Sequence, residues 1–157
     1  MVLGIHSNQE LTPAAKRVDQ AARGALRKAL GDLSGKAGST LLMRALPGVA
    51  AERLLLVGLG ERKEFSETSF REAVRGAGSA LKELGAKDAA LFLVDMKVAA
   101  RPVSWNVRQA VLGLRDAFYR FDQLKTQKKT SAPALERVVL PLSAKADLPV
   151  ALPHFRV

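Results

Sequence analysis

The spacing of apolar residues along the chain predicts three amphipathic helices. The first begins after Thr12 and Pro13, a capping residue followed by a proline suited to the first turn, and ends at Gly31. Ser66 and Ser104 are expected to cap the second and third helices, the second of which ends at Gly85. The apolar positions recur every three or four residues: Val18, Ala22, Ala25, Leu26 and Ala29 in the first; Phe70, Ala73, Val74, Ala77, Ala80, Leu81 and Leu84 in the second; Val107, Ala110, Val111, Leu114, Phe118 and Phe121 in the third.

Short apolar runs between these helices predict the strands of a sheet. They cover residues 2–5, 39–43, 53–57, 89–94 and 135–140. The second and third runs are bounded by glycine and proline, and we expect them to be strands covered on both faces. Strands that alternate with helices predict an α/β domain whose sheet lies between helices. The polar, basic segment 123–134 is expected to be a loop, and the segment beyond Pro141 a tail or linker.

Charge is the compositional property that bears most on partners. The 157 residues include 25 Lys and Arg and 15 Asp and Glu, so the net charge is +10, which favours contact with polyanions or an acidic surface. The length suits one domain. Cysteine is absent, which excludes disulfides and thiolate metal sites and fits a cytoplasmic location. We find no basic leader and no apolar run of membrane-spanning length, and therefore expect neither secretion nor membrane insertion.

The glycine turn at residues 58–60 resembles the opening of a dinucleotide-binding fingerprint. In that motif, backbone amides at the start of a helix bind phosphate. The third glycine of the fingerprint is missing here, because residues 61–63 are Glu, Arg and Lys. Glu64 and Glu67, close to the next helix, would also repel phosphate. We therefore interpret the turn as structural and keep nucleotide binding as the alternative.

Candidate residues for catalysis or metal binding are few and isolated. His6 and His154 are the two histidines, and they lie near opposite ends of the chain without an acidic cluster nearby. Asp95 and Asp122 lack the paired carboxylate that acid–base catalysis would need, so capping or ion pairing is the better explanation. The sequence contains no HExxH or GxSxG motif and no P-loop. We predict no catalytic residue, no metal ligand and no cofactor site in this chain.

Basic side chains favour a second class of function, the binding of nucleic acid. Three share a flank of the first helix, two are seven residues apart on the third, and three lie in the basic loop. The candidate contacts are Lys16, Arg23, Arg27, Arg108, Arg115, Lys125, Lys128 and Lys129. Such contacts would give salt-sensitive, sequence-independent binding to duplex DNA. A charged face that serves only solubility is the simpler alternative.

Two aromatic residues of the third helix have expected structural roles. Trp105, near its beginning, is either a packing residue or an interface anchor, and packing is favoured because a single tryptophan carries no pattern. Phe121 continues the apolar stripe and is expected to lie in the core.

Several segments, in this order, resemble the amino-terminal domain of the leucyl aminopeptidases. The most informative is Leu-Leu-Leu-Val-Gly-Leu-Gly at residues 54–60. It is preceded by Leu-Thr-Pro-Ala-Ala at 11–15, Ser-Gly-Lys-Ala-Gly at 34–38 and Thr-Leu-Leu at 40–42, and followed by Tyr-Arg-Phe-Asp at 119–122 and by Lys125. The resemblance implies a three-layer α/β/α fold with a mixed sheet, similar to macro domains, over residues 1–140. Residues 141–157 would then be a tail or linker towards an absent catalytic domain.

The resemblance also implies a function for the parent protein rather than for this chain. In this family a carboxy-terminal domain holds two divalent metals, zinc or manganese, and removes amino-terminal residues from peptides, and six chains assemble as two trimers. The family's signature Asn-Thr-Asp-Ala-Glu-Gly-Arg does not occur between Met1 and Val157. The resemblance therefore implies a non-catalytic domain that serves assembly and substrate access, with its own catalytic domain as partner.

One departure from the family and two alternatives follow from the same resemblance. Relatives carry a further strand ahead of residues 2–5, so we expect the sheet to have an unpaired edge. Some bacterial members also bind DNA, which makes a basic DNA-binding module the first alternative function. A macro-like nucleotide-binding domain is the second.

Overall fold

A mixed β-sheet carries the fold, and β3 (Arg53–Gly58) is the centre of its three-stranded part. The computed structural model describes residues 1–119 and 135–143. β3 pairs in parallel with β1 (Val2–Ile5) and antiparallel with β2 (Thr40–Arg44). β4 (Asp88–Ala90) and β5 (Arg137–Val139) form a parallel pair, and a parallel bridge between Val2 and Leu91 joins this pair to β1. All strands except β2 therefore run in the same direction.

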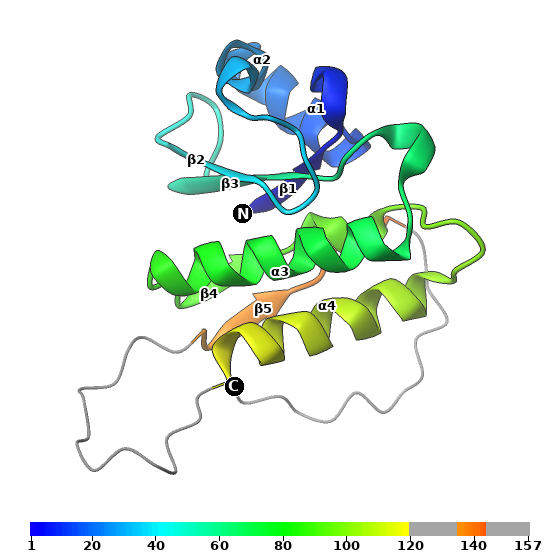
Figure 1. Ribbon diagram of the computed structural model, residues 1–157. Coiled ribbons are helices and arrows are strands. Elements are labelled where there is room, and N and C mark those ends of the chain that lie inside the picture. The colour runs from blue at the N-terminus through cyan, green and yellow to red at the C-terminus, as the bar shows by residue number, and fades with distance from the viewer. Residues whose placement is uncertain (120–134, 144–157) are drawn as a thin grey trace.

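Helices cover both faces of this sheet (Figure 1). α1 (Pro13–Ala21) and α2 (Ala25–Ala29) lie on one side, and α3 (Glu67–Glu83) and α4 (Val103–Phe118) lie on the other. The side chains of β3 alternate between the two layers because successive residues of a strand point to opposite faces. Leu54 and Leu56 belong to the cluster under α1 and α2, whereas Leu55 and Val57 belong to the cluster under α3 and α4. The predicted three-layer α/β/α fold with a mixed sheet is confirmed.

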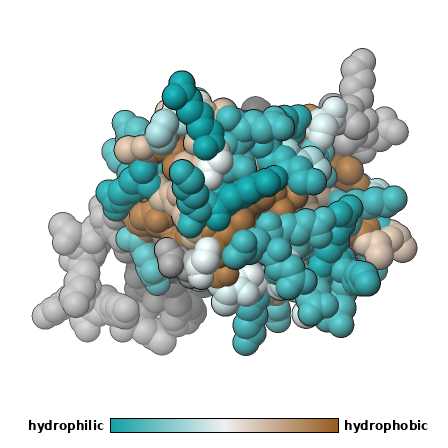
Figure 2. Space-filling view, turned by 90° about the horizontal axis from the view of Figure 1, so that it is seen from above, coloured by the Kyte–Doolittle hydropathy of each residue, from teal (hydrophilic) through white to brown (hydrophobic). Residues whose placement is uncertain are grey.

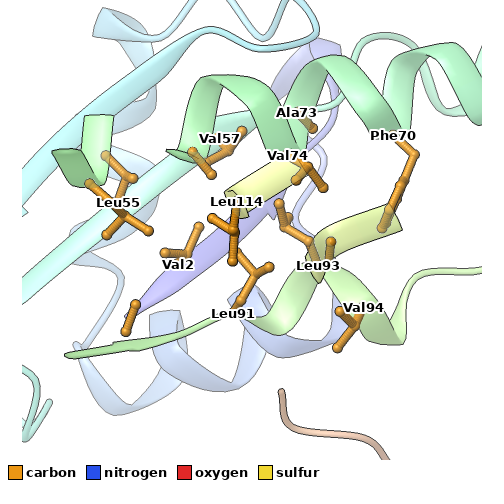
Figure 3. Close-up of a cluster of buried hydrophobic side chains, with 14 of the residues drawn as sticks. Val2, Leu55, Val57, Phe70, Ala73, Val74, Leu91, Leu93, Val94 and Leu114 are labelled. Atoms are coloured by element: carbon orange, nitrogen blue, oxygen red, sulfur yellow. The ribbon is translucent and has the colours of Figure 1, made fainter. Parts of the chain in front are cut away.

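The larger cluster lies between the sheet and the two long helices, and Figure 3 shows part of it. Phe70, Val74 and Leu114 reach it from the helices, Val2 from β1, and Leu91 from the residue after β4. Figure 2 shows the face on the side of α1 and α2, where hydrophilic side chains surround a strip of apolar ones. Among the described residues, no helix is long and apolar enough to span a membrane.

The prediction of one continuous first helix is wrong, because the chain breaks between α1 and α2. Thr12 caps α1 as expected, its side chain accepting a hydrogen bond from the Ala15 amide at 3.3 Å. Arg23 and Gly24 adopt left-handed backbone conformations, with φ of 53° and 81°, which end α1. The Asp19 carboxylate then accepts a hydrogen bond from the Arg27 amide, at 3.3 Å, in the first turn of α2. The apolar period continues across the break, so periodicity alone did not reveal it.

Two predicted strands differ from those observed. β2 is half-buried or exposed along its length rather than covered on both faces, since it is an outer strand of the sheet. The strand predicted at 89–94 is shortened to β4, and Phe92–Asp95 forms a 3₁₀ helix, η4. A tertiary contact accompanies this turn: the Asn106 side chain of α4 donates to the carbonyls of Val94 and Met96, at 3.0 and 2.6 Å. These carbonyls therefore bond to a helix side chain instead of a neighbouring strand.

The remaining predictions near the third helix are partly right. Ser66 caps α3, and Gly85 follows its end with a φ of 57°. Ser104 does not cap α4, because the helix begins at Val103 and its capping position is Pro102, two residues before the predicted one. The predicted stripe of α4 packs in the core through Val107, Ala110 and Leu114. The last predicted strand is shortened to β5, and Phe121, the loop at 123–134 and the tail beyond residue 143 lie outside the described residues.

Candidate functional site

The glycine turn at residues 58–60 lies where the carboxyl ends of β1 and β3 meet. Its amides donate to backbone carbonyls: Gly58 to Ser39 at 2.8 Å, Leu59 to Ile5 at 2.9 Å and Gly60 to Gly35 at 2.9 Å. A Cβ built on Gly58 would lie 2.1 Å from the Lys36 carbonyl oxygen. The turn therefore holds β1, β3 and the loop before β2 together, and its three amides are already used. This geometry favours the structural interpretation over phosphate binding.

His6 extends this cluster at the end of β1. It is 5% exposed, its Nδ1 lies 3.2 Å from the Gly60 carbonyl oxygen, and its ring stands nearly perpendicular to that of Phe65 at a centroid distance of 5.4 Å. Nδ1 must carry the proton in this contact, because a carbonyl can only accept. Burial lowers the pKa of His6 below its usual 6.5; the Gly60 carbonyl and Glu10 raise it, and Arg62 lowers it. His6 is therefore placed as a neutral packing residue.

The lowered pKa of His6 predicts a stability that falls in mild acid. Because the unfolded chain binds the proton more readily, the free energy of unfolding should decrease as the pH drops below about 6.5 towards the lower pKa of the folded state. His6→Asn keeps a donor near Gly60 but cannot be protonated, so it should reduce this dependence. Urea unfolding at pH 7.5 and 5.5 measures the difference. His154 is present in both the unaltered chain and the variant, so its contribution to the pH dependence cancels in the comparison. Identical pH dependences of the two proteins would contradict the prediction.

The carboxylates do not gather into a metal site in the described part of the chain. No group of three or more His, Cys, Asp or Glu side chains suited to a metal occurs within residues 1–119 and 135–143. Asp95 accepts hydrogen bonds from the amide of Ser143, at 3.1 Å, and from its hydroxyl, and so ties the segment after β5 to η4. This role differs from the capping or ion pairing expected. Asp122 and His154 lie outside the described residues.

The candidate nucleic-acid contacts fall on separate layers of the fold. Lys16 lies on α1, Arg23 in the break after it and Arg27 on α2, whereas Arg108 and Arg115 lie on α4, beyond the opposite face of the sheet. All five side chains are exposed, although Arg27 pairs with Asp19, its Nε 3.2 Å from Oδ2. Lys125, Lys128 and Lys129 lie outside the described residues. The five do not form one surface, and nucleic-acid binding stays a prediction.

Sequence reasoning missed a polar residue in the core and a charged group around Trp105. Asn106 is 1% exposed and lies on the apolar face of α4. A single asparagine among the apolar residues of a helix, following a predicted buried strand, is the sequence signal that could have revealed this residue. Trp105 packs against Phe70 at a centroid distance of 5.7 Å. The guanidinium carbons of Arg71 and Arg101 lie 5.5 and 5.7 Å from the centroid of the Trp105 ring. Trp105 is therefore half-buried and packed against the core, as predicted.

Comparison with solved structures defines the class of fold. The chain superimposes on the macro domain of ganglioside induced differentiation associated protein 2 with a TM-score of 0.64 at 19% identity, covering 93% of this chain and 71% of that one. A mutant leucine aminopeptidase from tomato gives the same TM-score, 0.64, at 23% identity, covering 90% of this chain and 29% of that one. The protein is thus a macro-domain-like α/β module.

Comparison of sequences defines the family. Residues 2–128 match the sequence model described as cytosol aminopeptidase family, N-terminal domain. The chain is 43% identical over 142 residues to a probable cytosol aminopeptidase of Nitrosospira multiformis, covering 89% of this chain and 27% of that protein. This chain belongs to the cytosol aminopeptidase family and corresponds to its N-terminal domain. It spans less than a third of the length of the curated relatives it matches.

Proposed function

We propose that this chain is the non-catalytic N-terminal domain of a metallo-aminopeptidase and that it serves assembly and substrate access. The observation that carries the proposal is the match of residues 2–128 to the N-terminal model of the family, while the chain covers only 27% of its Nitrosospira relative. The peptide-cleaving chemistry then belongs to the part of the relative that this chain does not match. Two divalent metals, zinc or manganese, would be held there.

The architecture of the chain supports a role as a scaffold. Most apolar side chains within residues 1–119 and 135–143 belong to two clusters on either side of one sheet. The turn at residues 58–60 has its amides committed to backbone carbonyls, which gives a nucleotide-binding role no support from this site. The partners proposed for the domain are its own catalytic domain, in a hexamer of such chains, and the proposed location is the cytoplasm. Peptides would be bound only by the complete assembly.

Hydrolysis of leucine amide with added manganese or zinc tests this proposal. The 157-residue chain is expected to be inactive, and the longer Nitrosospira protein active. A chimaera in which this chain replaces the matched region of that protein should keep activity and oligomeric mass. The Nitrosospira protein without its matched region should lose its assembly, because the scaffold is removed. Hydrolysis by the 157-residue chain alone would refute the proposal, as would normal assembly of the shortened relative.

A further inference from the structure

β2 presents an unpaired edge among the described residues, as the last strand in the order β1-β3-β2. Its backbone groups alternate in direction, because only every second residue of an antiparallel pair exchanges hydrogen bonds with the partner strand. The Gly58 amide donates to the Ser39 carbonyl at 2.8 Å, and the register then places the odd-numbered residues of β2 in the bonded pairs with β3. The N–H and C=O groups of Thr40, Leu42 and Arg44 therefore point away from β3.

The sequence of β2 is complementary to itself about Leu42. In a two-fold antiparallel pairing centred there, Leu42 lies opposite its own copy, and Thr40 lies opposite Arg44 of the other chain. On the other face of the strand, Leu41 lies opposite Met43, and both are half-buried apolar side chains. Centred on Leu41 instead, the pairing would leave Arg44 without an opposite residue in β2, and centred on Met43 it would leave Thr40 without one. The pairing about Leu42 is thus the one that uses the whole strand.

A hollow beside Thr40 gives this pairing complementary charges. Its volume is about 420 Å³, and it lies between β2 and α3. Its charged lining consists of Glu72, Arg75 and Glu83 of α3, so that two carboxylates stand against one guanidinium and the hollow is acidic. The pairing brings Arg44 of the second copy beside Thr40 and therefore to this hollow. By symmetry the dimer contains the same contact twice.

A second hollow, of about 440 Å³, lies beside Leu42 and has balanced side-chain charges. Its apolar walls come from leucines, and its charged lining from two acidic and two basic residues: Leu42, Leu55, Leu81 and Leu84; Glu52, Asp88, Arg53 and Lys87. This lining favours neither a cation nor an anion. The pairing brings two uncharged side chains of the second copy to this side of the strand, those of Leu42 and Thr40.

We propose that β2 pairs with β2 of a second copy of this chain, about a two-fold axis at Leu42, so that the two sheets become one. An unpaired edge is a template for another strand. A second copy is favoured over an unrelated peptide because one register of its own sequence supplies both a cation for the acidic hollow and apolar partners for the apolar residues. The inference does not rest on the proposed function, since the pairing needs neither a catalytic domain nor metals.

Disulfide cross-linking tests the register, because the chain has no cysteine of its own. The Cα atoms of a bonded antiparallel pair are about 5.5 Å apart, within the range of a disulfide. Leu42→Cys should therefore form a covalent dimer under mild oxidation. Thr40→Cys is the matched control, because Thr40 and its copy would lie about 14 Å apart, too far for a disulfide. Thr40→Cys and Arg44→Cys should cross-link when mixed, although neither does so alone.

Sedimentation equilibrium tests the charge complementarity. The 157-residue chain is expected to dimerise with increasing concentration. Arg44→Glu should weaken the dimer by about tenfold or more, because both symmetric contacts would then place like charges together. Arg44→Lys keeps the charge and should change the dissociation constant by less than about threefold. Adding Glu83→Arg to Arg44→Glu should restore dimerisation, because the two charges are exchanged.

Hydrogen exchange of the unaltered chain keeps the test decisive if a variant fails to fold. The amides of Leu42 and Arg44 should exchange more slowly at high protein concentration, whereas those of Leu41 and Met43 face β3 and should not change. A monomer at every concentration, with unchanged exchange at Leu42 and Arg44, would overturn the proposal. A dimer in which Thr40→Cys cross-links as fast as Leu42→Cys would also overturn it, because the register would differ. Protection only by an added peptide, acetyl-Thr-Val-Arg-Val-Leu-Val-Thr-amide, would overturn it in favour of a peptide partner.

Discussion

Gly58→Ala is expected to lower the free energy of unfolding by about 3 kcal/mol or more, although the substitution adds only one methyl group. The added Cβ would lie 2.1 Å from the Lys36 carbonyl oxygen and 2.4 Å from the Ser39 hydroxyl oxygen. The first of these atoms belongs to the backbone and cannot move without displacing the loop before β2. For a domain of this size the loss corresponds to a fall in Tm of roughly 10 °C. Thermal unfolding followed by circular dichroism measures it.

Gly31→Ala is the matched control for this prediction. No heavy atom lies within 4 Å of the Cβ that the substitution would add, and Gly31 does not have a positive φ. The same chemical change should therefore be neutral or slightly stabilising, by less than about 1 kcal/mol, because alanine restricts the unfolded chain. Equal melting temperatures for the two variants would mean that the contact between the turn and the loop does not constrain the fold.

Phe70→Ala is expected to cost about 3–5 kcal/mol, the range found for the removal of a buried aromatic ring. Phe70 is 0% exposed and joins α3 to the cluster under the sheet, where Trp105 packs against it at 5.7 Å. Removal of the ring leaves a cavity that α3 and α4 cannot close, since both helices are held by other contacts in the same cluster. A loss of this size is a large part of the stability of an ordinary domain. Urea denaturation gives the value directly.

Leu112→Ala controls for the loss of an apolar side chain that is not in the core. Leu112 lies on α4 and is 40% exposed, and leucine and alanine are both good helix formers. Its substitution should change the free energy of unfolding by about 0.5 kcal/mol or less. If Phe70→Ala were no more destabilising than Leu112→Ala, the cluster between the sheet and the long helices would not be the main core.

The family assignment and the layered fold could be predicted because both depend on short-range patterns. Strand β3 is a run of apolar residues, and such a run is typical of a strand covered on both faces. The alternation of Leu54, Leu55, Leu56 and Val57 between the two cores follows directly from the strand repeat. The candidate site was predicted less well. At residues 58–60 the missing third glycine and the nearby glutamates favoured a structural turn over a phosphate-binding one, but the sequence did not show which backbone carbonyls the amides of the turn bond to.

Local sequence therefore determined which segments form helices and strands and which faces they bury, because side-chain periodicity is set within a few residues. Contacts between distant segments decided the rest. Asn106 of α4 bonds the carbonyls of Val94 and Met96 around the 3₁₀ turn η4, and the loop at residues 35–39 occupies the amides of Gly58 and Gly60. The partial exposure of β2 is likewise a consequence of its place as an outer strand of the sheet. A backbone group can bond only to a partner that the tertiary fold brings near, and periodicity carries no record of that partner.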